Sequence, residues 1–114
     1  MISISQIQAF SQQIAEKFEP EQIILFGSYA SGKPDEDSDV DLLVVLPFEE
    51  MPVRKAIEIR QSLPAPFPLD LIARTPEQVQ QRLEMGDFFI QDIMKNGQIL
   101  YEANHLRVGW QSRS

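Results

Sequence analysis

Residues 27–41 read "GSYASGKPDEDSDVD" and run directly into the apolar stretch "LLVVL" at 42–46. Five of the seven residues from Asp35 to Asp41 are acidic. Like charges repel one another, and a neighbouring buried strand disfavours ionised groups, so this arrangement is costly unless something compensates it. The stretch therefore predicts both a buried strand and a bound cation at its start.

The composition limits the class of protein. The chain has 114 residues, a formal net charge of −7 and no cysteine. This length suits one domain with its own core. The lack of cysteine excludes disulfides, thiolate metal sites and thiol nucleophiles, and it agrees with a cytoplasmic protein. No apolar run approaches the ~20 residues that cross a bilayer. The net negative charge argues against strong nucleic-acid binding, because proteins that bind nucleic acid usually have a basic face.

Hydrophobic periodicity predicts strands alternating with helices, which indicates an α/β (α+β) domain. We expect one domain over residues 1–104 and a loose tail at 105–114. The expected helices cover 3–18, 53–63, a segment from 76 to about Gly86, and 87–95, with one helical turn near 28–31. The expected strands cover 22–26, 39–46, 69–73 and 98–101, the last at an edge of the sheet.

Asp39 and Asp41 lie two residues apart at the start of the strand over 39–46. Positions i and i+2 of a strand point to the same face, so both carboxylates should project together. We expect them at the end of the sheet where Gly27 leaves the first strand. Divalent cations relieve the repulsion, and hard carboxylate oxygens suit Mg²⁺ or Mn²⁺.

Gly27 and Ser28 are suited to binding phosphate, because glycine admits close approach and the next amides and hydroxyl are neutral donors. Asp70 interrupts an apolar strand, where a carboxylate is costly unless paired or metal-bound. If that strand lies beside 39–46, Asp70 can join the other two aspartates. Three carboxylates allow two metal ions, one on a triphosphate and one activating a hydroxyl, with Asp70 as ligand and candidate base.

Gly27-Ser28, ten intervening residues and Asp39-Val40-Asp41 resemble the Gly-Ser…Asp-x-Asp signature of the DNA polymerase beta nucleotidyltransferase superfamily. Asp70 is similar to its third carboxylate. The spacing and length resemble the minimal nucleotidyltransferases, or MNT proteins, over roughly residues 5–101. The resemblance implies a small mixed sheet flanked by helices.

The resemblance also implies transfer of a nucleoside monophosphate, foremost AMP from ATP, onto a hydroxyl with release of pyrophosphate. In that role Asp39, Asp41 and Asp70 would bind metal, and Gly27 and Ser28 would hold the triphosphate. Minimal members often act as antitoxins of a HEPN-domain toxin, in some cases by adenylylating a tyrosine of that toxin. An acceptor site from such a partner, or from a second copy, is expected because this chain has no room for a second domain.

One residue departs from the family pattern. Relatives often carry arginine two residues after the position of Tyr29, and this chain has Ser31 there. Either a phosphate contact is missing, or Lys33 supplies it.

Other interpretations stay open. Asp39 and Asp41 also suit turn and strand-entry caps, and Asp70 also suits the exposed side of an edge strand. His105, the one histidine, suits a solvent or structural role. Adjacent Phe88 and Phe89 point to two faces of a helix, so one of them can face a partner.

At the level of function, the alternative is an antitoxin that neutralises its partner by binding alone, with a vestigial nucleotide site. Two other functions fit less well. An enzyme that transfers the nucleotide to a small molecule typically needs a longer chain to form the acceptor pocket. A template-directed polymerase needs a basic surface to hold a duplex.

Overall fold

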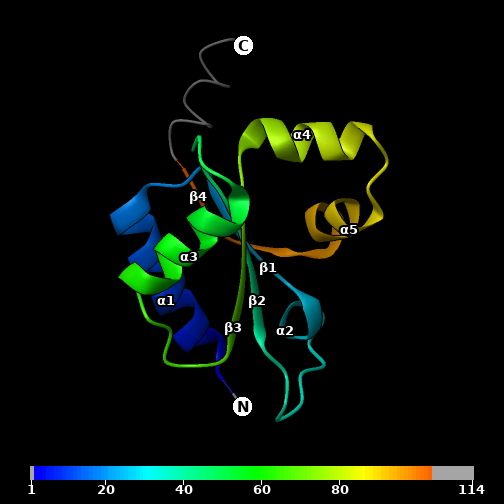
Figure 1. Ribbon diagram of the computed structural model, residues 1–114. Coiled ribbons are helices and arrows are strands. Elements are labelled where there is room, and N and C mark those ends of the chain that lie inside the picture. Colours follow the sequence, from blue (N-terminus) through cyan, green and yellow to red (C-terminus); the bar gives the residue numbers. More distant parts are fainter. Residues whose placement is uncertain (1, 104–114) are drawn as a thin grey trace.

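The computed structural model describes residues 2–103, in which a four-stranded sheet carries helices on both faces (Figure 1). The α/β (α+β) class is confirmed. The predicted tail at 105–114, with His105, lies outside the described residues. No helix within 2–103 has both the length and the apolar character needed to span a membrane. The elements are α1 (Ile4–Phe18), β1 (Gln22–Phe26), α2 (Gly27–Ser31), β2 (Val40–Val45), α3 (Pro52–Ser62), β3 (Leu69–Arg74), α4 (Pro76–Glu84), α5 (Phe88–Asn96) and β4 (Gln98–Glu102).

The sheet has the strand order β3-β2-β1-β4. β1 runs antiparallel to both β2 and β4, while β2 and β3 run parallel to each other and are joined through α3. The predicted mixed sheet is therefore confirmed, and so is the expectation that the strand at 98–101 lies at an edge. β2 is an inner strand whose residues other than Asp41 are buried, as its unbroken apolar run predicts.

Local sequence signals explain where the helices begin. Ser3 and Thr75 each form a capping box with the glutamine three residues later, and Pro76 occupies the first turn of α4. α5 begins one residue later than predicted. The Asp87 carboxylate accepts hydrogen bonds from the backbone N–H groups of Phe89 and Ile90 at 2.9 and 3.2 Å, so Asp87 is the N-cap rather than the first helical residue.

Alternation along the strands gives the sheet two apolar faces, each covered by helices. In Figure 1 the sheet is seen nearly edge-on, with α1 and α3 on its left and α4 and α5 on its right. Leu42 and Val44 pack with α1 and α3, whereas Leu43 and Val45 pack with α4 and α5. Asp41 is two residues before Leu43, so its carboxylate lies on the α4/α5 face.

Helix α3 offers a matched test of this packing. Ile59 is fully buried between α3 and the sheet, while Ile57 in the same helix is 47% exposed. We expect Ile59→Ala to lower the free energy of unfolding by about 2–4 kcal/mol, through lost burial and a residual cavity. Ile57→Ala should cost less than about 1 kcal/mol. Urea denaturation measures both, and equal losses would contradict the assignment of α3's buried side.

Candidate active site

Three neighbouring strands place an aromatic ring and two carboxylates in one row. The register pairs Phe26 of β1 with Asp41 of β2, and Asp41 with Asp70 of β3. The predicted neighbourhood of Asp41 and Asp70 is therefore confirmed. Because paired residues on adjacent strands point to the same face, both carboxylates lie on the α4/α5 face. Asp39 immediately precedes β2 and shares their electrostatic environment.

Burial and neighbouring carboxylates make the ionisation of Asp41 costly. The pKa of Asp41 is raised above its ordinary value, first by partial burial and then by the charges of Asp70 and Asp39. Among residues 2–103, the ion pairs shorter than 4 Å involve other acidic groups and leave these three without a cationic partner. The end of β2 therefore concentrates uncompensated negative charge.

The three aspartates do not converge on one point. Within the part of the chain that the structure describes, no group of three or more histidine, cysteine or acidic side chains is gathered closely enough to hold a metal ion. The donor set itself, carboxylate oxygens at adjacent strand ends, fits a hard cation such as Mg²⁺ or Mn²⁺. Asp39 and Asp70 are both exposed, so solvent ions can reach their carboxylates.

Gly27 follows β1 directly and lies against the Asp41 carboxylate. Its φ is +74°, a conformation that other residues rarely adopt, and a Cβ at this position would overlap the carboxylate of Asp41. Glycine is thus required both by the turn and by the close approach. The structure thus places the Gly-Ser turn beside Asp41 at one end of the sheet.

Ser28 is half-buried at the start of α2. Its carbonyl accepts hydrogen bonds from the Lys33 backbone N–H and from the Ser31 hydroxyl, each at 3.0 Å. Among residues 2–103 no hydrogen bond engages the Ser28 hydroxyl itself, so it is available to a ligand. The Ser31 hydroxyl, by contrast, closes the helical turn at the position where relatives often carry arginine.

A pocket of about 540 Å³ opens between α2 and α5, beside Gly27. This volume falls in the range of small-molecule sites. Its lining residues are Phe26, Gly27, Ala30, Ser31, Asp92, Asn96 and Gly97. Lys33 is exposed on the loop after α2 and is not among them, so its role as a phosphate ligand stays a prediction.

Sequence reasoning missed the contribution of α5 to this pocket. Phe89, Asp92 and Asn96 recur at helical spacing along one side of α5, and that spacing was the available signal. The Asn96 side chain donates to the Asp92 carboxylate at 2.7 Å. Phe89 packs edge-on against Phe26, with ring centroids 5.6 Å apart, and remains half exposed. The Phe26 ring, contacted by Phe89, and the Asp92–Asn96 pair therefore line the pocket.

The sequence model of the nucleotidyltransferase domain matches residues 7–100 of this chain. The MntA protein adenylyltransferase of Thermococcus cleftensis is 40% identical over 70 residues, which cover 57% of this chain and 69% of that protein. MJ0141 of Methanocaldococcus jannaschii, assigned as a protein adenylyltransferase, is 45% identical over 51 residues, covering 43% of this chain and 50% of that protein.

Solved structures agree on the fold. A Sulfolobus solfataricus protein assigned to the nucleotidyltransferases superposes with a TM-score of 0.61 at 19% identity, over 86% of this chain and 78% of its own. At that identity the likeness concerns the fold alone. The matched segment contains the Gly-Ser turn and all three aspartates. The chain therefore belongs to the nucleotidyltransferase domain family and is a nucleotidyltransferase similar to the MntA protein adenylyltransferases.

Proposed function

We propose that this protein transfers AMP from ATP onto a hydroxyl group of a partner protein. The observation that carries the proposal is the row of uncompensated carboxylates lying against the Gly27 turn, because a metal-bound triphosphate needs both kinds of group within one site. The names of the two archaeal relatives, both protein adenylyltransferases, support ATP as the donor and a protein as the acceptor.

The transfer is a single displacement at phosphorus. The acceptor oxygen forms a bond to the α-phosphorus, the bond from that phosphorus to the oxygen bridging to the β-phosphate breaks, and pyrophosphate leaves. The proton of the acceptor hydroxyl passes to Asp70, whose exposed position lets an acceptor reach it. Gly27 and Ser28 hold the phosphates. Mg²⁺ held by Asp39, Asp41 and Asp70, as two ions or with Mn²⁺ in its place, would supply charge neutralisation and activation of the hydroxyl.

For the acceptor we propose a tyrosine of a HEPN-domain toxin in the cytoplasm, with this protein as its antitoxin. The support is the resemblance to minimal nucleotidyltransferases and the similarity to MntA. Asp70 is exposed on the edge strand β3, where a hydroxyl of a partner protein can reach it.

Neutralisation by binding alone is the second candidate. The observation that favours it is the set of apolar side chains that project from the surface, of which Phe88 is 85% exposed. A surface of this kind is typical of a protein interface.

Replacing the paired carboxylates separates the two candidates. We expect Asp39→Asn/Asp41→Asn to reduce nucleotide transfer by at least about 10³-fold, because the cation site loses two of its charged ligands. Intact mass spectrometry of the partner toxin, after incubation with Mg²⁺ and ATP, measures the added nucleotide. Asp37→Asn, an exposed aspartate of the same loop, is the control and should transfer at the wild-type rate. A double variant that still neutralises the toxin would favour binding alone.

The raised pKa of Asp41 predicts a trade between stability and function. Its folded-state pKa lies above the ordinary value of 3.8, so ionisation of Asp41 opposes folding. The stabilising effect of protonated Asp41 is complete below that ordinary value and is lost as pH rises through the folded-state value. At pH 7 without divalent ions, Asp41→Asn should therefore raise the melting temperature by roughly 1–3 °C, a small shift because the group is solvent-screened.

Thermal melts between pH 3 and pH 8 test this linkage. The advantage of Asp41→Asn should shrink as pH falls, and added Mg²⁺ should raise the melting temperature of the wild type more than that of the variant. A less stable variant at pH 7 without Mg²⁺ would show that ionised Asp41 is stabilised rather than repelled.

A further inference from the structure

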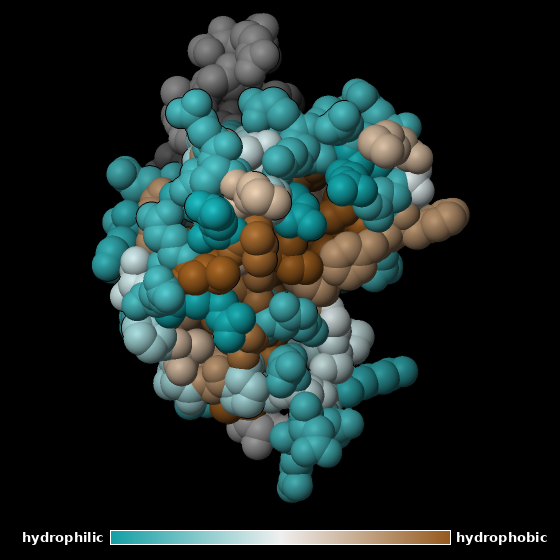
Figure 2. All heavy atoms as spheres, viewed as in Figure 1, coloured by the Kyte–Doolittle hydropathy of each residue, from teal (hydrophilic) through white to brown (hydrophobic). Residues whose placement is uncertain are grey.

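The pocket between α2 and α5 begins where the phosphates of a nucleotide are expected. Gly27 lines this pocket and also lies against the Asp41 carboxylate. The proposed phosphate and metal ligands therefore meet the pocket at its Gly27 end. Figure 2 shows the surface hollowed at this place, below the hydrophobic side chains that project on the right, where Figure 1 places α5. A nucleotide whose phosphates bind at Gly27 can extend from there into the pocket.

Close packing fixes α5 as one wall of this pocket. A Cβ on Gly97, which follows α5, would overlap the Ile93 carbonyl oxygen and the Ile24 side chain, so the chain passes close to β1 only because this residue is glycine. The side-chain amide of Gln98 donates to the Ala30 carbonyl at 2.8 Å, which joins the segment after α5 to α2. The two walls of the pocket are thus tied to each other.

The wall that α5 contributes is polar. Asp92 and Asn96 both line the pocket, and the Asn96 side-chain amide donates to Asp92 Oδ1 at 2.7 Å. An ionised carboxylate only accepts hydrogen bonds, so Asn96 presents its Nδ2 to Asp92. The ion pairs within 4 Å among residues 2–103 leave Asp92 without a cationic partner. The pair therefore offers a ligand free carboxylate lone pairs beside an amide N–H.

This pattern of acceptor and donor is complementary to one edge of adenine. Adenine presents its 6-amino N–H groups beside a ring nitrogen that accepts a hydrogen bond. In the same orientation guanine turns its 6-oxo oxygen, which is an acceptor, toward the Asp92 carboxylate, and two acceptors repel each other. The charge of Asp92 also repels phosphate, so the base rather than the triphosphate suits this end of the pocket.

We propose that Asp92 and Asn96 bind the adenine base and thereby make the protein select ATP among the nucleoside triphosphates. The proposal rests on the proposed function and identifies its nucleotide by the base. We call the pocket the adenine pocket; its lining residues are Phe26, Gly27, Ala30, Ser31, Asp92, Asn96 and Gly97.

Phe89 adds an aromatic surface beside the adenine pocket. The Phe89 ring packs edge-on against Phe26, a lining residue, with ring centroids 5.6 Å apart. Phe89 lies on the side of α5 that carries Asp92 and Asn96, and it is 51% exposed. Bases stack on exposed aromatic rings whatever their hydrogen-bonding edge. We therefore expect Phe89 to add affinity for any purine, and Asp92 to add selectivity for adenine.

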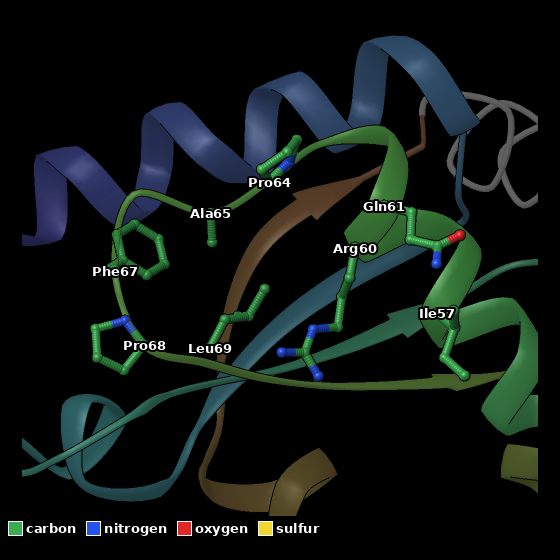
Figure 3. Close-up of a pocket in the computed structure, with 8 residues that line it drawn as sticks. All are labelled: Ile57, Arg60, Gln61, Pro64, Ala65, Phe67, Pro68 and Leu69. Atoms are coloured by element: carbon green, nitrogen blue, oxygen red, sulfur yellow. The ribbon is translucent and has the colours of Figure 1, made fainter.

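A second pocket, of about 440 Å³, does not offer this chemistry. Figure 3 shows it between α3 and the segment before β3, with the Arg60 side chain extending from α3 toward β3. Two of its lining residues, Phe67 and Leu69, pack with the core on the α1/α3 face. Asp41 lies on the other face, so the sheet separates this pocket from a nucleotide bound at Gly27.

Removing one group from the nucleotide and one from the protein tests the proposed hydrogen bond. The probes are ATP and purine riboside triphosphate, which lacks only the 6-amino group, each with Mg²⁺ and without the partner toxin. Isothermal titration calorimetry measures both dissociation constants. We expect the wild type to bind ATP at least about fivefold more tightly than the analogue, because a hydrogen bond to a charged group is lost. Asp92→Ala should bind the two equally, to within about twofold.

Glu84→Ala is the matched control for Asp92→Ala. Glu84 accepts a hydrogen bond from Gln80 at 3.1 Å in an equivalent i,i+4 pair on α4, outside the adenine pocket, and its replacement removes the same charge. This variant should keep the wild-type preference for ATP over the analogue. An Asp92→Ala variant with the wild-type preference, or a wild type that binds GTP more tightly than ATP, would overturn the proposal.

The neighbouring aromatic residues of α5 supply a second matched pair. Phe89→Ala should weaken the binding of ATP and of the analogue alike, by at least about fivefold, because stacking does not depend on the 6-amino group. Phe88→Ala, at a ring that is 85% exposed, should change neither affinity by more than about twofold. Equal ATP affinities in the two variants would overturn the assignment of Phe89 to the base.

The failure of each idea has its own signature, because binding is measured without the toxin and transfer with it. A protein that transfers nucleotide to the toxin but shows the same ATP preference with and without Asp92 would overturn the adenine pocket and leave the proposed function standing. A protein whose ATP preference depends on Asp92 but which transfers no nucleotide would support the adenine pocket and overturn the proposed function.

Discussion

The repulsion between Asp41 and its acidic neighbours is the constraint on which the rest of the site depends. Asp41 is the second residue of β2, whose other residues are all buried, and the parallel pairing of β2 with β3 places Asp70 directly beside it. Partial burial and two nearby negative charges make its ionised form costly. A bound cation and substrate would relieve this cost, and this supports our proposal that this end of the sheet is the functional end.

The surrounding architecture holds the charges together while keeping them accessible. Two helices on each face bury the sheet, so β2 is fixed in place by its apolar side chains. The positive φ of Gly27 turns the chain away from β1 without a side chain that would displace Asp41. β3 is an edge strand, so Asp70 remains exposed. The same topology gives the proposed base access to an acceptor.

Much of the fold follows from local signals. The capping boxes at Ser3 and Thr75, the period of the apolar residues and the unbroken run after Asp41 predicted the elements to within a residue or two. Local signals did not predict the position of Asp70 in the sheet. Asp70 was expected either to join the other aspartates or to sit exposed on an edge, and the structure places it beside Asp41 and exposed on an edge strand, because position in the sheet depends on pairing between distant segments. The pocket wall from α5 was missed because Asp92 resembles any exposed helical aspartate until α2 is packed beside it.

The sequence by itself determined the element types, the Gly27-Ser28 turn, the spacing of Asp39 and Asp41, and through them the family. These features depend on backbone preferences and on residues close together in the chain. Only the tertiary structure decided that Asp70 pairs with Asp41, that β3 is an edge strand, and that α5 closes a pocket over Gly27. Strand order and helix packing arise from burying apolar surface contributed by distant segments, and no local pattern encodes that choice.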